Sequence, residues 1–161
     1  MDETFADCWN RKRSNLGFKD IETEFIDCGG HVLPRDAAPC LVFDMAARPA
    51  PIWEVFGIPS DWSPADRERL AACRMIGSDG AGNPICVELG TGVVVLLDHE
   101  DWFRTRQFVN TSVQKLAECL LAYIGQQESE RFRSAAQAID PAAFAVGSFW
   151  WHDAACLDTD A

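Results

Sequence analysis

The sequence predicts a compact core in which a small sheet is covered by a helix. Between residues 74 and 97, three short apolar segments are separated by glycine-rich turns, a pattern typical of adjacent strands joined by tight connections. Apolar side chains then recur at helical spacing between residues 113 and 124. Such a sheet needs an apolar cover on at least one face, and the helix supplies one. A chain of 161 residues is long enough to bury this core.

The first fifty residues carry the weakest structural signals. Residues 3–12 fit a short helix, residues 24–28 fit an extended segment ended by two glycines, and residues 39–44 fit a strand. No internal repeat or long linker interrupts the sequence. We therefore expect residues 1–161 to form one domain.

The first well-marked helix begins at Ser63 and Pro64. A serine hydroxyl can accept a hydrogen bond from a free main-chain N–H, and proline suits the first helical position. We expect this helix to run to Cys73 and to be followed by a strand at residues 74–78. Residues 79–83, DGAGN, then predict a hairpin loop.

The next two strands are predicted at residues 84–89 and 93–97. Alternate residues of a strand share a face, so in the first of these strands we expect Cys86 and Glu88 to face away from the core. The core-facing residues of that strand would be Ile85, Val87 and Leu89. The segment 93–97 is apolar on both faces, which predicts an interior strand.

The longest helix is predicted to follow residue 112. Thr111 and Gln114 fit a capping box, in which side chains bind free main-chain N–H groups. Gly125 follows the last apolar residue and predicts the end of the helix. Its apolar stripe comprises Val113, Leu116, Ala117, Leu120, Leu121 and Ile124.

The C-terminal part has helix-forming composition at residues 128–138. Asp140 and Pro141 then fit a break and a restart, with aspartate as the cap and proline as the first helical residue. We expect a last helical segment to carry the aromatic residues Phe144, Phe149, Trp150 and Trp151.

The net charge is −11. An acidic surface repels the phosphates of nucleic acid and attracts basic proteins, so we expect no direct binding of nucleic acid. No segment is apolar enough for a membrane span, and the N-terminus lacks the pattern of an export signal. We therefore expect a cytoplasmic protein without membrane contact.

Seven cysteines are scattered without a CxxC pair. This odd number and wide spacing disfavour a zinc site or a disulfide framework. In a reducing compartment, thiols within apolar segments behave as small hydrophobic groups. We expect free cysteines and no cofactor.

The glycines of the first hairpin suggest a phosphate-binding loop, but that kind of loop leads directly into a helix. Here strand-forming residues follow, so we interpret these glycines as structural: Gly77, Gly80 and Gly82.

Residues 98–101 form the one local cluster of carboxylates with a histidine in the sequence, and two aromatic residues follow it. Such groups can bind a divalent cation or transfer protons, or form a solvated turn. An aromatic anchor beside charges also suits a protein interface. A solvated turn at the end of the strand is the first interpretation, contact with a partner is the second, and catalysis or metal binding is the third. The predicted contact residues are Asp79, Asp98, Glu100, Asp101 and Trp102.

Two segments, residues 76–100 and residues 108–123, resemble the SUKH superfamily of bacterial immunity proteins. In that superfamily a gly-x-asp-gly turn leads through two strands to a phe-x-asn-(ser/thr) turn and a helix. The matching residues are Gly77, Asp79, Gly80, Gly82, Asn83, Phe108, Asn110, Thr111 and Ser112. Asp140, Pro141, Phe144, Phe149 and Trp150 resemble the C-terminal helix of one branch. The resemblance spans roughly residues 53–152.

This resemblance implies an α+β fold with a mainly antiparallel sheet flanked by helices. It also implies a non-enzymatic, cytoplasmic antidote that binds the C-terminal effector domain of a cognate toxin, often one that acts on nucleic acid. Such an effector has a basic site that an acidic protein can occupy. The motif residues have structural roles in this interpretation, with Asn110 and Thr111 forming a helix cap.

Two alternatives remain open at the level of sequence. The chain could be a regulatory or ligand-binding scaffold module, which would bind a host protein without inhibiting an activity. It could also be a hydrolase built on Asp98, His99 and Glu100.

Overall fold

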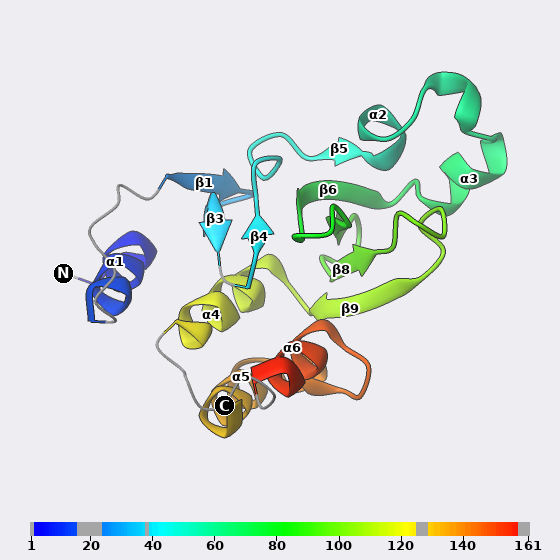
Figure 1. Cartoon of the computed structure of the whole chain (residues 1–161). Coiled ribbons are helices and arrows are strands. Elements are labelled where there is room, and N and C mark those ends of the chain that lie inside the picture. The colour runs from blue at the N-terminus through cyan, green and yellow to red at the C-terminus, as the bar shows by residue number, and fades with distance from the viewer. Residues whose placement is uncertain (1, 16–23, 38, 125–128, 158–161) are drawn as a thin grey trace.

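The structure, a computed structural model, describes residues 2–15, 24–37, 39–124 and 129–157. It contains an antiparallel sheet with helices packed on both faces (Figure 1). Each strand pairing in the described part of the chain is antiparallel. The predicted α+β fold, a mainly antiparallel sheet flanked by helices, is therefore confirmed.

The strands of the described residues form a hairpin, β1–β2, and a seven-stranded sheet. The sheet has the order β3-β4-β6-β7-β8-β9, and β5 also pairs with β6. The interior position of β8 agrees with its apolar sequence. The strands are β1 (Phe25–Cys28), β2 (His31–Pro34), β3 (Asp36–Ala37), β4 (Leu41–Val42), β5 (Ala50–Pro51), β6 (Cys73–Ser78), β7 (Pro84–Glu88), β8 (Val94–Leu97) and β9 (Arg106–Asn110).

The helices lie on opposite faces of the sheet. α4, α5 and α6 contribute to one apolar cluster, and the segment containing α2 and α3 contributes to the other. The helical elements are α1 (Phe5–Asn15), α2 (Ile52–Val55), η1 (Pro59–Asp61), α3 (Pro64–Arg69), α4 (Val113–Tyr123), α5 (Ser129–Ile139), η2 (Pro141–Phe144) and α6 (Phe149–Leu157).

Strand β8 shows how the sheet serves two cores. Val94 and Leu96 belong to the cluster beneath α4, α5 and α6, whereas Val95 and Leu97 belong to the cluster beneath α2 and α3. All four side chains are buried because successive residues of a strand point to opposite faces.

The predicted one-sided burial of β7 is wrong in part. Ile85 packs in the first cluster as predicted, but Cys86 is completely buried in the second, and Leu89 is 53% exposed beyond the end of the strand. The sequence pattern assumed one covered face, whereas the segment containing α2 and α3 covers the other face as well.

The helix predicted to reach Cys73 is shorter. Ser63 does cap it, since its Oγ accepts a hydrogen bond from the N–H of Asp66 at 3.1 Å. α3 ends at Arg69, and Cys73 already pairs with Glu88 in the sheet. Strands β2, β3, β5 and β9 were not predicted, because each is short or mixed in polarity.

The predicted capping box at Thr111 is also wrong. The cap of α4 is Ser112, whose Oγ accepts a hydrogen bond from the N–H of Lys115 at 3.1 Å. Thr111 instead donates its main-chain N–H to Oδ2 of Asp140 at 2.8 Å. The predicted helix end at Gly125 lies outside the described residues.

The predicted role of Asp140 as a helix cap is wrong. Its side chain makes no capping hydrogen bond to η2 and is only 2% exposed. Oδ2 accepts hydrogen bonds from Asn110 Nδ2 at 3.0 Å and from the Thr111 N–H. Asn110 Oδ1 in turn accepts a hydrogen bond from Trp150 Nε1 at 2.9 Å. This buried network joins the end of β9 to η2 and α6.

Different structural constraints require glycine at the positions of the first hairpin. Gly82 has a φ of +85°, which a turn requires and which other residues rarely adopt. Gly77 lies against β4, where a Cβ atom would be 2.1 Å from the carbonyl oxygen of Val42. Gly77 thus allows a close backbone approach and no turn, and the structural interpretation of the three glycines stays a prediction.

The described cysteine thiols are free, and their surroundings predict unequal reactivity. Burial raises the pKa of the Cys86 thiol, and burial also raises the pKa of Cys119 to about 12. The thiolate is the reactive form. We expect iodoacetamide at neutral pH to modify the exposed Cys40 and to leave Cys86 and Cys119 unmodified until the protein is unfolded. Peptide mass spectrometry would measure this, and rapid labelling of Cys119 in the folded protein would contradict it.

Candidate partner-binding surface

Two turns meet at one end of the sheet, and they contain all five predicted contact residues. One turn joins β6 to β7 at residues 79–83, and the other joins β8 to β9 at residues 98–105. Asn83 connects them, because its Oδ1 accepts the main-chain N–H of His99 at 3.1 Å and lies 2.7 Å from His99 Nδ1. The structure therefore brings Asp79 near the 98–101 cluster, which sequence spacing did not indicate.

Three of the predicted acidic residues hold the turns in shape. Asp79 Oδ1 accepts the N–H groups of Ala81 and Asn83, both at 2.9 Å. Asp98 Oδ1 accepts the N–H of residue 100 at 2.8 Å. Asp101 accepts the N–H groups of residue 104 at 2.9 Å and of Thr105 at 2.8 Å. A hydrogen bond from the Thr105 side chain stabilises the ionised form of Asp101 and lowers its pKa.

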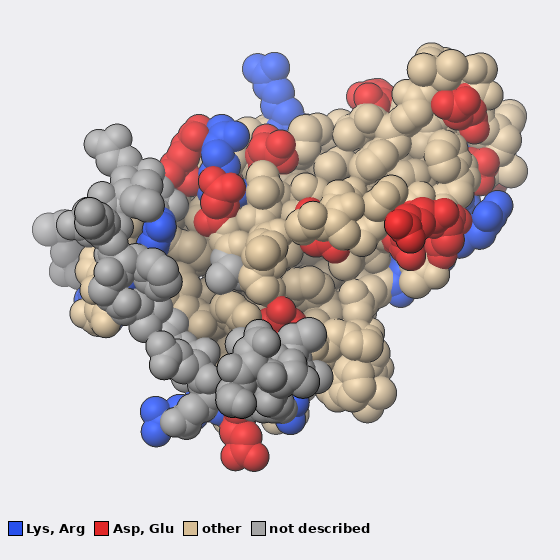
Figure 2. All heavy atoms as spheres, viewed as in Figure 1, with Lys and Arg blue, Asp and Glu red and all other residues tan. Residues whose placement is uncertain are grey.

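Glu100 differs from these three, because its exposed carboxylate has no hydrogen bond or ion pair within the described residues. Figure 2 shows acidic side chains gathered over the end of the sheet where β8 leads into β9. Glu100 is consequently the acid of this turn that is best placed to contact another molecule.

Trp102 is held in an unusual backbone conformation. Both Trp102 and Phe103 have a φ of 61°, a left-handed conformation that is costly for large side chains. Arg69 stabilises it by donating hydrogen bonds to the Trp102 carbonyl at 3.1 Å and to the Phe103 carbonyl at 2.8 Å. Trp102 stacks on Trp62 with ring centroids 4.5 Å apart, so its ring is only partly accessible.

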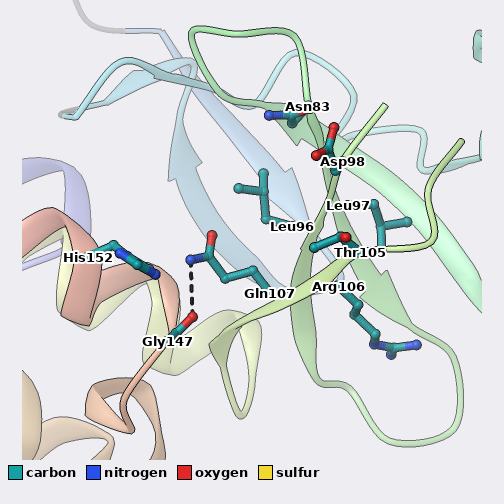
Figure 3. A pocket seen from close by; sticks show the side chains of 9 residues that line it. All are labelled: Asn83, Leu96, Leu97, Asp98, Thr105, Arg106, Gln107, Gly147 and His152. Carbon is teal, nitrogen blue, oxygen red and sulfur yellow. Dashed lines mark hydrogen bonds between the residues drawn. The ribbon is translucent and has the colours of Figure 1, made fainter. Parts of the chain in front are cut away.

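A cavity of about 300 Å³ lies beside this turn. Its lining includes Leu96, Asp98 and His152 (Figure 3). Gln107 lines it too, and its side-chain amide donates a hydrogen bond to the Gly147 carbonyl at 3.2 Å, which joins β9 to the start of α6. His152 is exposed. The structure thus places this histidine on the lining of the same cavity as Asp98.

The side chains of Asp98, His99 and Glu100 are not arranged as a catalytic triad. His99 faces Asn83, and the Asp98 carboxylate accepts a hydrogen bond from the main chain of Glu100. Within the described ranges, no group of three or more His, Cys, Asp and Glu side chains could hold a metal ion. In that same part of the chain, no helix is long and apolar enough to cross a membrane.

Comparison with known proteins gives one match, to the family model described as SUKH-4 immunity protein, over residues 33–157. The match begins before residue 53, so it includes strands β3, β4 and β5, which the sequence resemblance did not reach. No curated protein and no solved structure matches the chain. Since the family model covers most of the sequence and the fold agrees with it, the chain belongs to the SUKH-4 immunity protein family.

Proposed function

We propose that this protein binds the C-terminal effector domain of a cognate toxin and inhibits it without catalysing a reaction. Membership of an immunity protein family supports this function. We place the contact surface on the two turns at residues 79–83 and 98–105. Asn83 links these turns by a hydrogen bond, and Glu100 is exposed on the second of them.

The charge of the chain favours an effector that acts on nucleic acid. A net charge of −11 attracts a basic domain and accelerates its association. Enzymes that handle nucleic acid carry basic substrate-binding surfaces. Occupation of such a surface by the carboxylates at this end of the sheet would exclude the substrate. We propose that this binding takes place in the cytoplasm, where the toxin-producing cell needs protection.

Glu100→Lys tests the contact surface. We expect association with the effector domain to slow by about tenfold at low salt, with less effect at high salt, because long-range attraction is screened by ions. The thermal unfolding temperature should stay within about 2 °C, since an exposed side chain without partners contributes little stability. Surface plasmon resonance would measure the association rate for the effector domain encoded beside this protein.

Glu130→Lys is the matched control, because Glu130 is exposed on α5 and the substitution changes the net charge equally. We expect this control to change the association rate by less than about twofold. Equal slowing in both variants would contradict the proposed surface and indicate an effect of total charge. Substitutions of Asp98 and Asp101 are less suitable, since both carboxylates bind main-chain N–H groups of the turn.

A further inference from the structure

An exposed apolar patch lies on the segment that connects α2 to α3. Val55 at the end of α2 is 39% exposed, and Ile58 before η1 is 61% exposed. Singly exposed apolar side chains are common on soluble proteins, whereas contiguous ones mark interaction sites. These side chains can serve as a binding site if the backbone of the segment is ordered.

Hydrogen bonds hold the segment in one conformation. Asp61 Oδ2 accepts the N–H of Ile58 at 2.9 Å, and Trp62 Nε1 donates to the carbonyl of Phe56 at 2.8 Å. Gly57 between them has a φ of +70°, a backbone conformation that glycine adopts readily. Ile58 is therefore presented to solvent by a fixed backbone. A backbone segment ordered before binding loses less conformational entropy when it binds a partner.

Contacts between aromatic rings join the segment that carries the patch to the acidic turn. Trp62 stacks on Trp102, and the ring centroids of Phe56 and Phe103 are 4.9 Å apart. α2 and α3 lie at the same end of the molecule as the connection from β8 to β9 (Figure 1). The segment that carries Val55 and Ile58 is thus packed against the turn of residues 98–103.

This surface carries more carboxylates than cations. Glu54, Asp61 and Glu68 are exposed in the segment, in addition to the acids of the 98–101 turn. The two arginines of α3 are already engaged within the protein. Arg67 lies 5.8 Å over the Trp53 ring, and Arg69 pairs with Asp66 and binds the main chain of the turn. Arg104 is a further exposed cation in the turn, and its Nη1 donates to the carbonyl of Asp101 at 3.4 Å. The carboxylates still outnumber the arginines, so the charge around the patch complements a cationic partner.

We infer that Ile58 and Val55 are the apolar anchors of the toxin interface, and that the carboxylates around them and on the 98–101 turn contact a basic rim on the effector domain. This inference rests on the proposed function and adds the segment of residues 54–61 to the contact surface. An apolar centre with a charged rim is the usual organisation of a protein interface. The partner should consequently present an apolar recess bordered by lysine or arginine.

The double variant Val55→Ser/Ile58→Ser tests the anchors without changing the charge. We expect it to bind the effector domain encoded beside this protein about 30-fold more weakly. The loss should lie mainly in faster dissociation, because contacts formed in the complex determine its lifetime. The matched control is Val146→Ser, since Val146 is 84% exposed and lies between η2 and α6. It should bind within about twofold of the wild type.

The outcomes separate this inference from the proposed function. Failure of the wild-type protein to bind or inhibit the effector domain would overturn both. Normal inhibition by the wild type and equally tight binding by the double variant would overturn the anchors and leave the function standing. Wild-type dimers that the double variant converts to monomers in analytical ultracentrifugation would also overturn the inference, because the patch would then join two copies of this chain. Thermal unfolding of each variant checks that it is folded.

Discussion

Asp140→Ala should lower the free energy of unfolding by about 4 kcal/mol. Asp140 is 2% exposed, and its Oδ2 accepts hydrogen bonds from Asn110 Nδ2 and from the main-chain N–H of Thr111. Alanine would leave the Thr111 N–H without its acceptor and would leave Asn110 Nδ2 only its weak hydrogen bond to Cys119 Sγ at 3.4 Å. Each lost hydrogen bond to Asp140 costs about 1–3 kcal/mol. Asn110 would also be less firmly held where it binds Trp150. Chemical denaturation monitored by tryptophan fluorescence would measure the change.

Two variants provide controls for this substitution. Asp140→Asn keeps an oxygen acceptor, so we expect it to recover at least half of the lost stability. Asp44→Ala removes a carboxylate from an exposed position and should change stability by less than about 0.5 kcal/mol. If Asp140→Ala were as stable as Asp44→Ala, the buried network would not contribute to the folded state as described.

Gly77→Ala should also destabilise the protein by about 4 kcal/mol. The added Cβ would lie 2.1 Å from the Val42 carbonyl oxygen and 2.9 Å from Phe43 Cα. Both atoms belong to the main chain, so no side-chain rotation can relieve the collision. β4 would have to move away from β6, to which it pairs through Val42 and Ser78. Overpacking of a core costs about 1–3 kcal/mol, and more where the backbone must move.

Gly82→Ala separates this collision from the general cost of replacing a glycine. Gly82 has a φ of +85° but no atom within 4 Å of the added Cβ. We therefore expect a loss of about 1 kcal/mol from backbone strain alone. Equal losses in the two variants would show that the approach of β4 to Gly77 is not what requires glycine there. Hydrogen exchange of the β4 and β6 amides would locate the change.

Much of the central unit could be predicted from the sequence, because its signals are local. The glycine-rich turns predicted the hairpins, and the apolar spacing after residue 112 predicted α4. Ser63 was predicted correctly as a cap, since a cap depends on residues only three positions apart. Ser112 was missed because the neighbouring Thr111 can make the same kind of hydrogen bond, and only the backbone geometry distinguishes them.

The candidate surface was predicted in part. The acids and Trp102 of the 98–102 turn were selected by composition, and whether they contact a partner stays a prediction. The patch at Val55 and Ile58 had no such signal. In the sequence, these residues resemble core residues, and their exposure depends on the path of the chain around Gly57.

The sequence by itself determined the acidic charge, the turns, the main helices and the family resemblance, because these depend on composition and on residues near one another in the chain. Only the tertiary structure showed that Asp140 is buried beside Asn110, that Gly77 lies against Val42, and that Trp62 stacks on Trp102. These contacts join residues far apart in sequence. Their formation depends on how the strands and helices pack, and this packing cannot be predicted from local sequence patterns.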